Sequence, residues 1–154
     1  MKRIDSFCVN HDKLKPGMYV SRIDGDAVTY DIRMVVPNAG VYLENDGLHT
    51  FEHLFATYVR NSADSDNIIY VGPMGCRTGF YLILAGDYES EDIVTLLTEM
   101  FTFIRDYEGT IPGAAAKDCG NYLDLNLPMA KYLAEKFLDE VLYDIKPDRL
   151  IYPQ

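Results

Sequence analysis

Apolar residues follow a strand pattern in the first half of the chain. Residues 17–36 predict a β-hairpin, because two stretches rich in β-branched and aromatic residues flank a turn sequence at 24–26. Residues 68–71 and 79–85 predict two further strands, and the second is almost entirely apolar. We therefore expect a sheet built from these four strands.

A helical spacing of apolar residues marks three other segments. The first predicted helix covers about residues 47–61, with Asp46 as its N-cap. Ser90 can cap a second helix, and Asn126 can cap a third that has Pro128 in its first turn. Each helix has one apolar stripe, so each is expected to bury one face.

The order of elements is strands, helix, strands and then helices. This order is typical of an α+β fold, so we predict an antiparallel sheet with helices packed on one face, in a single domain of residues 1–154. Residues 108–126 predict a long loop that contains several glycines. A loop of this length in a compact domain is usually functional or flexible.

Composition narrows the function. The 154 residues suit one domain, and 14 basic against 24 acidic residues give a net charge of −10. This charge disfavours binding to nucleic acid or to anionic membrane surfaces. The sequence shows neither a membrane-span pattern nor a signal-peptide pattern, so we expect a cytoplasmic protein. Three cysteines are an odd count, which argues against a disulfide scaffold and leaves them available for chemistry.

The stretch from His49 to His53 has the order H-x-x-E-H. On a helix, residues four apart share a face, so the two imidazoles can bind one ion, and Glu52 lies on the same side, where it can move protons. The pattern is equally compatible with two polar helix residues that bind nothing. A third ligand could be Cys119 in the long loop, since imidazole with thiolate suits Zn²⁺ or Fe²⁺, although a lone cysteine is often a small buried hydrophobe.

Cys76 lies in a glycine-rich stretch between the third and fourth predicted strands. Arg77 next to the thiol would favour the thiolate, which makes Cys76 a candidate acid, base or nucleophile. The competing interpretation is a tight turn that carries an inert cysteine. Residue types alone favour the inert cysteine.

Taken together, four segments resemble the S-ribosylhomocysteine lyase family, also called LuxS. They are Ser6-Phe7 with Asn10-His11, Tyr30-Asp31-Ile32-Arg33 leading to Pro37-Asn38, His49 to Ala56, and Gly72 to Tyr81. Cys119-Gly120 follows at the distance usual in the family. The family's common D-I-S-P-M-G-C begins with Tyr70 in place of aspartate, and its usual glutamine before Pro-Asn is Val36, so the grip on the amino-acid end of the substrate is expected to differ.

The resemblance implies a metal-dependent enzyme. The ion would be held by His49, His53 and Cys119, with Fe²⁺ expected in the cell and Zn²⁺ or Co²⁺ able to substitute. Glu52 and Cys76 would be the catalytic pair. The residues implied for substrate binding are Ser6, His11, Arg33 and Arg60.

The family also implies a homodimer with two sites at the subunit interface, each lined by both chains. The implied reaction converts S-ribosylhomocysteine into homocysteine and 4,5-dihydroxy-2,3-pentanedione, the autoinducer-2 precursor of quorum sensing, by two carbonyl migrations and a β-elimination. Two other interpretations stay open. One is an H-x-x-E-H metallopeptidase, which would usually supply a carboxylate as third ligand. The other is a non-catalytic module closed by a fourth ligand, for which His11 is a candidate.

Overall fold

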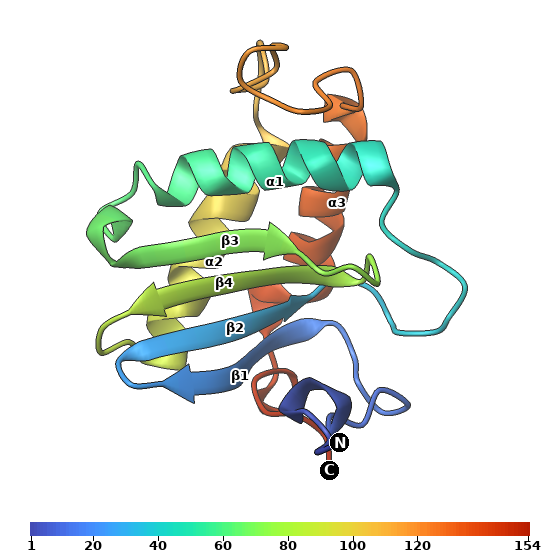
Figure 1. The fold of residues 1–154 in the computed structure, drawn as a ribbon, viewed down its shortest axis with the longest axis vertical. Helices are drawn as coiled ribbons and strands as arrows, with labels where there is room; N and C mark the ends of the chain where they lie inside the picture. Colours follow the sequence, from blue (N-terminus) through green and yellow to red (C-terminus); the bar gives the residue numbers. More distant parts are fainter.

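The computed structural model describes residues 1–154, in which four strands form one antiparallel sheet (Figure 1). The strands are β1 (Gly17–Asp24), β2 (Ala27–Arg33), β3 (Ile68–Pro73) and β4 (Gly79–Ala85). They lie in the order β1-β2-β4-β3, so two hairpins are joined through the pair β2–β4. The four predicted strands are confirmed.

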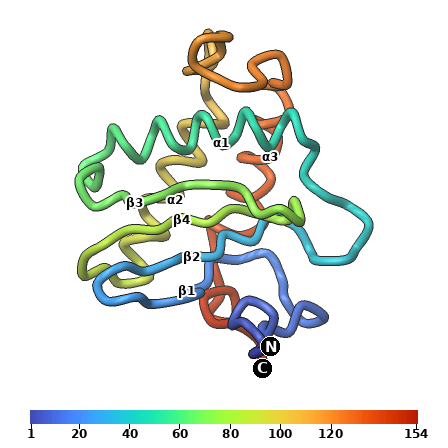
Figure 2. Tube along the Cα trace, in the orientation of Figure 1, coloured from blue at the N-terminus to red at the C-terminus, as the bar shows by residue number.

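Three helices cover one face of this sheet. They are α1 (Asn45–Val59), α2 (Ser90–Arg105) and α3 (Leu127–Glu140). In Figures 1 and 2, α1 runs along the β3 edge, and α2 and α3 pass behind the strands. The predicted α+β fold is confirmed, and none of these helices is both long and apolar enough to cross a membrane.

A cluster of 29 buried residues fills the space between sheet and helices. Phe51 of α1 is at its centre, with its ring centroid 5.1 Å from those of both Phe80 on β4 and Phe101 on α2. Phe101 in turn lies 4.7 Å from Phe137 on α3. This aromatic chain ties each helix to the sheet and so fixes α1, the helix that carries the H-x-x-E-H motif.

Some predicted element ends were wrong. β2 ends at Arg33 rather than at residue 36, because the next two backbone N–H groups donate to the Thr78 carbonyl oxygen instead of continuing the ladder. The N-cap of α1 is Glu44, not the predicted Asp46. The Asp46 carboxylate instead accepts hydrogen bonds from the Gly47 N–H and from the Asn126 side chain.

Of the other two predicted N-caps, that of α2 was wrong by one residue and that of α3 is confirmed. The N-cap of α2 is Glu89, one residue before Ser90, and its N–H donates to the Asp92 carboxylate at 2.9 Å. For α3 the prediction is confirmed, since the Asn126 side chain accepts from the Met129 N–H at 3.0 Å. Residues 108–126 form turns without a regular helix or strand, as predicted.

The outward face of the sheet carries buried charge. Along β2, Tyr30 and Ile32 point into the core, so the alternation of a strand places Asp31 and Arg33 on the opposite side. Both are nevertheless buried, in a cavity that Tyr152 and four residues of the N-terminal segment help to line: Ser6, Phe7, Val9 and His11. Both chain ends lie near β1 in the view of Figure 2, and Lys13 Nζ of the N-terminal segment donates to the Gln154 carbonyl oxygen at 2.9 Å.

Candidate functional site

His49 and His53 lie one turn apart on α1, with their Nε2 atoms 3.1 Å from each other. The Nδ1 of His49 is 2.8 Å from the Asp124 carbonyl oxygen, and the Nδ1 of His53 is 2.7 Å from that of Pro112. Because a carbonyl oxygen only accepts, both Nδ1 atoms carry the proton and both Nε2 atoms present lone pairs. Two lone pairs facing each other at this distance call for a cation between them.

Cys119 completes this cluster from the long loop. Its Sγ is 3.4 Å from His49 Nε2, and one ligand atom from each of the three residues lies within 4.8 Å of the others. Tetrahedral Zn²⁺ with its usual bond lengths places neighbouring N and S ligands roughly 3.3–3.6 Å apart. The donor set suits a divalent metal ion, and the separations of 3.1 Å between the two Nε2 atoms and 3.4 Å between His49 Nε2 and Sγ are close to this range.

The long loop is fastened to α1 on both sides of the cluster. At one end, the Asn126 N–H donates to Thr50 Oγ1 at 2.7 Å. At the other end, the Pro112 carbonyl oxygen binds His53 Nδ1 at 2.7 Å. The next residue, Gly113, has a φ of +72°, and a Cβ there would lie 3.2 Å from the same Nδ1. The loop thus delivers both the thiol of Cys119 and the carbonyls that orient the two imidazoles.

Glu52 is half-buried beside the metal cluster. It shares a shallow cleft of about 320 Å³ with His53, Gly113 and Asp118. The carboxylate is therefore open to a molecule that approaches the cluster. This is the placement that the H-x-x-E-H spacing predicted.

Cys76 lies elsewhere, at the end of the β3–β4 hairpin. A cavity of about 340 Å³ brings its exposed thiol together with Ser6, His11 and Arg33. Three of the four residues predicted for substrate binding thus meet at Cys76. His11 lies in this cavity and is not part of the three-residue metal cluster.

The Arg33 guanidinium is the positive charge beside the thiol. Its Nη1 is 4.0 Å from Cys76 Sγ and donates to Thr78 Oγ1 at 2.7 Å. The Thr78 hydroxyl, 3.1 Å from Sγ, is then free to give its own proton to the sulfur. Burial lowers the pKa of Arg33, but the hydrogen bond and charge of Asp31 outweigh this and leave the pKa raised. Arg33 is therefore a permanent cation next to Cys76.

The predicted role of Arg77 is taken by Arg33. Arg77 has a φ of +59°, and its guanidinium carbon lies 5.8 Å from the centre of the Tyr42 ring. Sequence adjacency suggested Arg77, whereas the β2–β4 register, which pairs Arg33 with Gly79, brings the distant arginine to the thiol.

Arg60 is the one predicted substrate residue that does not line the Cys76 cavity. It is the C-cap of α1, and its Nη2 donates to the Ile69 carbonyl oxygen at 3.2 Å. In this structure Arg60 bridges the end of α1 to β3.

Three residues at the Cys76 cavity were missed by the sequence analysis: Asp31, Thr78 and Tyr152. A charged residue between apolar neighbours in a strand was an available signal for Asp31. Nothing in the local sequence pointed to Tyr152, which comes from the C-terminal tail.

The fold and these two clusters define an α+β protein with a metal-binding cluster, an adjacent carboxylate and a cationic thiol pocket, as in a metal-dependent enzyme. The family model described as S-Ribosylhomocysteinase (LuxS) matches residues 4–148, and the chain belongs to this family. A protein named S-ribosylhomocysteine lyase from Clostridium beijerinckii is 58% identical, covering 99% of each chain. Those of Clostridium acetobutylicum (57%) and Finegoldia magna (54%) each match over 100% of both chains. The resemblance stated from the sequence is confirmed.

Proposed function

We propose that the protein is a lyase that cleaves the thioether of S-ribosylhomocysteine, giving homocysteine and 4,5-dihydroxy-2,3-pentanedione, the autoinducer-2 precursor. Family membership and the name of its relatives support this activity. The observation that carries it is the Cys76 thiol beside the buried Arg33 guanidinium, in one cavity with Ser6 and His11. One hydrophobic core draws on all four strands and all three helices, from Met18 to Leu142, which supports a single domain of residues 1–154.

The metal is proposed to be one divalent ion per subunit, held by His49, His53 and Cys119. The family resemblance implies Fe²⁺, with Zn²⁺ or Co²⁺ able to substitute, and imidazole and thiolate donors suit iron and zinc. When bound, the ion supplies a Lewis acid that polarises the oxygens of the open sugar. The cluster has three donors, which leaves a coordination position for substrate.

The chain's own residues move the protons. The Cys76 thiolate, stabilised by Arg33, takes a proton from the carbon next to the carbonyl and returns one to the old carbonyl carbon. Glu52 exchanges protons with the sugar oxygens. Two such shifts carry the carbonyl from C1 to C2 and then to C3. Removal of the C4 proton then expels the homocysteine thiolate from C5, and no redox cofactor is needed.

Two interpretations from the sequence are not favoured. A metallopeptidase of the H-x-x-E-H type would usually have a carboxylate as third ligand, whereas the third donor here is the Cys119 sulfur. A non-catalytic module would close the ion with a fourth ligand, and His11, the candidate, lies at Cys76 instead.

We infer a homodimer whose sites use both chains. The cavity at Cys76 and the cleft at Glu52 have no lining residue in common, so one chain does not enclose both catalytic groups in a single pocket. Apolar side chains on and beside the outward face of the sheet remain exposed and can pack against a second copy; they are Ile4, Phe7, Ile69 and Tyr70.

Mixing two inactive variants tests the shared site. Cys76→Ala and Glu52→Gln each remove one catalytic group, and a heterodimer of the two has one intact site if each site draws on both chains. After random reassembly, activity should return to about a quarter of the wild-type level. If both groups of a site come from one chain, no activity returns.

The activity itself is tested by offering S-ribosylhomocysteine and a set of peptides to the Fe²⁺-loaded protein. Release of a free thiol with a dicarbonyl product supports the lyase. Peptide cleavage without thiol release would overturn it.

A further inference from the structure

The C-terminal tail reaches the Cys76 cavity through Tyr152. The Tyr152 hydroxyl donates to Asp31 Oδ2 at 2.7 Å, and Arg33 Nη2 donates to the same oxygen at 2.6 Å. Arg33 Nε donates to the other carboxylate oxygen at 3.1 Å. Asp31 is therefore held by Arg33, two residues further along β2, and by Tyr152, which is 121 positions away in the sequence.

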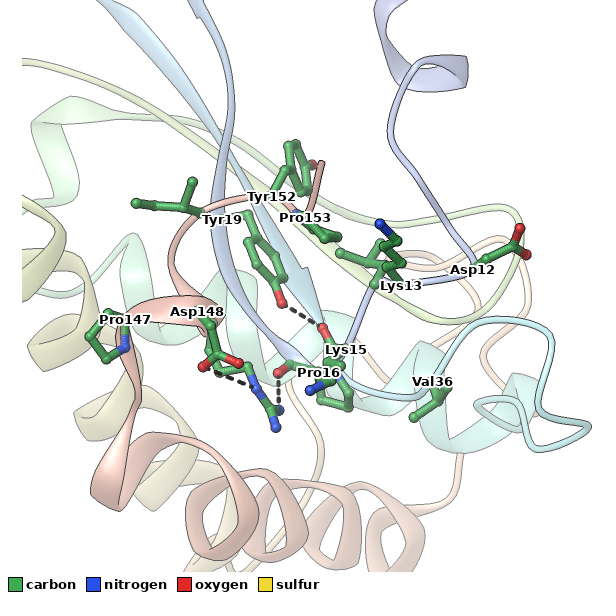
Figure 3. A pocket seen from close by; sticks show the side chains of 13 residues that line it. Asp12, Lys13, Lys15, Pro16, Tyr19, Val36, Pro147, Asp148, Tyr152 and Pro153 are labelled. Carbon is green, nitrogen blue, oxygen red and sulfur yellow. Dashed lines mark hydrogen bonds and ion pairs between the residues drawn. The ribbon is translucent and has the colours of Figure 1, made fainter.

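The Tyr152 ring is itself fixed in place. It stacks on Tyr19 with centroids 5.0 Å apart and planes 19° apart, and Figure 3 shows both rings beside a cavity of about 980 Å³. Two further contacts hold the C-terminal region, from Arg149 Nη1 to the Pro16 carbonyl oxygen and from Lys13 Nζ to that of Gln154, both at 2.9 Å. The tail is thus part of the packed structure on this side of the sheet.

We propose that Tyr152 is a positioning residue for Cys76: its hydroxyl fixes the Asp31 carboxylate, which in turn holds the Arg33 guanidinium against Thr78 and the thiol. The proposal rests on the assignment of Cys76 as the proton-transfer group. It makes the last residues of the chain part of the machinery that prepares the thiol.

The burial of the pair explains why one hydroxyl matters. Asp31 is 0% and Arg33 3% exposed, so water does not replace a lost donor there without opening the site. A carboxylate with an unsatisfied lone pair shifts or draws in water, and the guanidinium bonded to it moves as well. Since Arg33 Nη1 is already 4.0 Å from Sγ, a small displacement removes its contact with the sulfur.

Tyr152 acts as a constant donor. Burial, followed by the charge of Asp31, raises its pKa well above the usual value for tyrosine, so the phenol keeps its proton at neutral pH. The polar side chains that also line the cavity, apart from Asp31, Arg33 and Cys76, are Ser6, His11, Ser21 and Tyr81. None of them donates a hydrogen bond to Asp31, whose side-chain donors are Arg33 and Tyr152, so they do not substitute for the Tyr152 hydroxyl.

The test measures how fast iodoacetamide alkylates Cys76 in the metal-loaded Tyr152→Phe protein at pH 7. Cys8, also exposed, is an internal reference in the same chain, and mass spectrometry reads both. We expect the Cys76 rate relative to Cys8 to fall about three- to tenfold, because thiolate character controls the rate. We expect kcat to fall by a similar factor, with little change in KM and none in metal content.

Tyr143→Phe is the matched control, since its exposed hydroxyl accepts from Arg105 and lies outside the cavity. It should leave the alkylation ratio unchanged. A chain ending at Leu150 removes Tyr152 altogether and should match or exceed the effect of Tyr152→Phe. Wild-type alkylation ratios in both Tyr152 variants would overturn the proposal. Because this ratio needs no turnover, it is independent of whether the wild type releases homocysteine.

Discussion

Arg33 Nη1 lies 4.0 Å from Cys76 Sγ, although these residues are 43 positions apart and Cys76 lies in the turn between β3 and β4. The contact follows from the antiparallel pairing of β2 with β4, which sets Arg33 opposite Gly79 at the mouth of the β3–β4 hairpin. Asp31 keeps the guanidinium charged in a buried place. The Cys76 thiol, which lies in a turn, therefore faces a guanidinium that its ion pair with Asp31 holds in place.

Replacing Arg33 by Lys should cost stability as well as reactivity. Lysine keeps the charge but loses the two-point bond to Asp31, so we expect the free energy of unfolding to fall by about 1–3 kcal/mol. Urea denaturation measures this change. Arg22→Lys is the control, because its ion pair with Asp24 is more than half exposed, so the free energy of unfolding should stay almost unchanged. Equal losses in the two variants would contradict the buried role of Arg33.

Cys119→Ala should lose the metal. The thiolate is one of only three donors in the cluster, so we expect metal content to drop from about one ion per chain to a small fraction of that. Elemental analysis after dialysis measures it. Cys8→Ala, which removes an exposed cysteine outside the cluster, should keep its full metal content. Full content in Cys119→Ala would remove this residue from the ligand set.

Gly113→Ala should weaken metal binding, although Gly113 is not itself a metal ligand. A Cβ would crowd His53 Nδ1 at 3.2 Å and disturb its bond to the Pro112 carbonyl. Loss of such an orienting contact typically costs about 10–100-fold in metal affinity. Competition with a chelator gives the affinity. Gly40→Ala has a similar positive φ, +83° against +72°, but meets open space, so it should destabilise the backbone without affecting the metal. Equal affinities in both variants would contradict the prediction.

Stability should fall at alkaline pH, in part through Tyr152. Its pKa is raised in the folded chain, so above about pH 10 the unfolded chain binds fewer protons than the folded one. The free energy of unfolding then decreases as pH rises, while below pH 10 the contribution is fully present. Urea denaturation at pH 8 and 10.5 should show a smaller decrease for Tyr152→Phe than for the wild type. Identical decreases would show that Tyr152 does not contribute.

Local patterns in the sequence were enough to predict the individual strands and helices. The alternation in residues 17–36 and the stripe around Phe51 predicted the hairpin and α1, because each depends on neighbours within a few residues. The residues at which strands and helices begin and end were harder to predict. β2 stops at Arg33 because Thr78, 45 residues away, takes the next two N–H groups, and no local pattern contains that information.

The candidate site divides in the same way. His49, Glu52 and His53 share one helix face, so their spacing made them candidates for a metal cluster, and the family resemblance then favoured this interpretation with Cys119 as third ligand. The environment of Cys76 depends on strand register and on the chain end, and this is why Arg77 was expected where Arg33 is found. Tyr152 gave no signal, since its role exists only when the tail packs across β1 and β2.

The most direct test of the proposed lyase compares homocysteine release by the wild type and by Cys76→Ala. Each protein is loaded with Fe²⁺, and its metal content is measured. The wild type should release homocysteine from S-ribosylhomocysteine, and Cys76→Ala should keep its metal, because Cys76 lies outside the ligand cluster, yet release none. No release by the metal-loaded wild type, or normal release by Cys76→Ala, would contradict it.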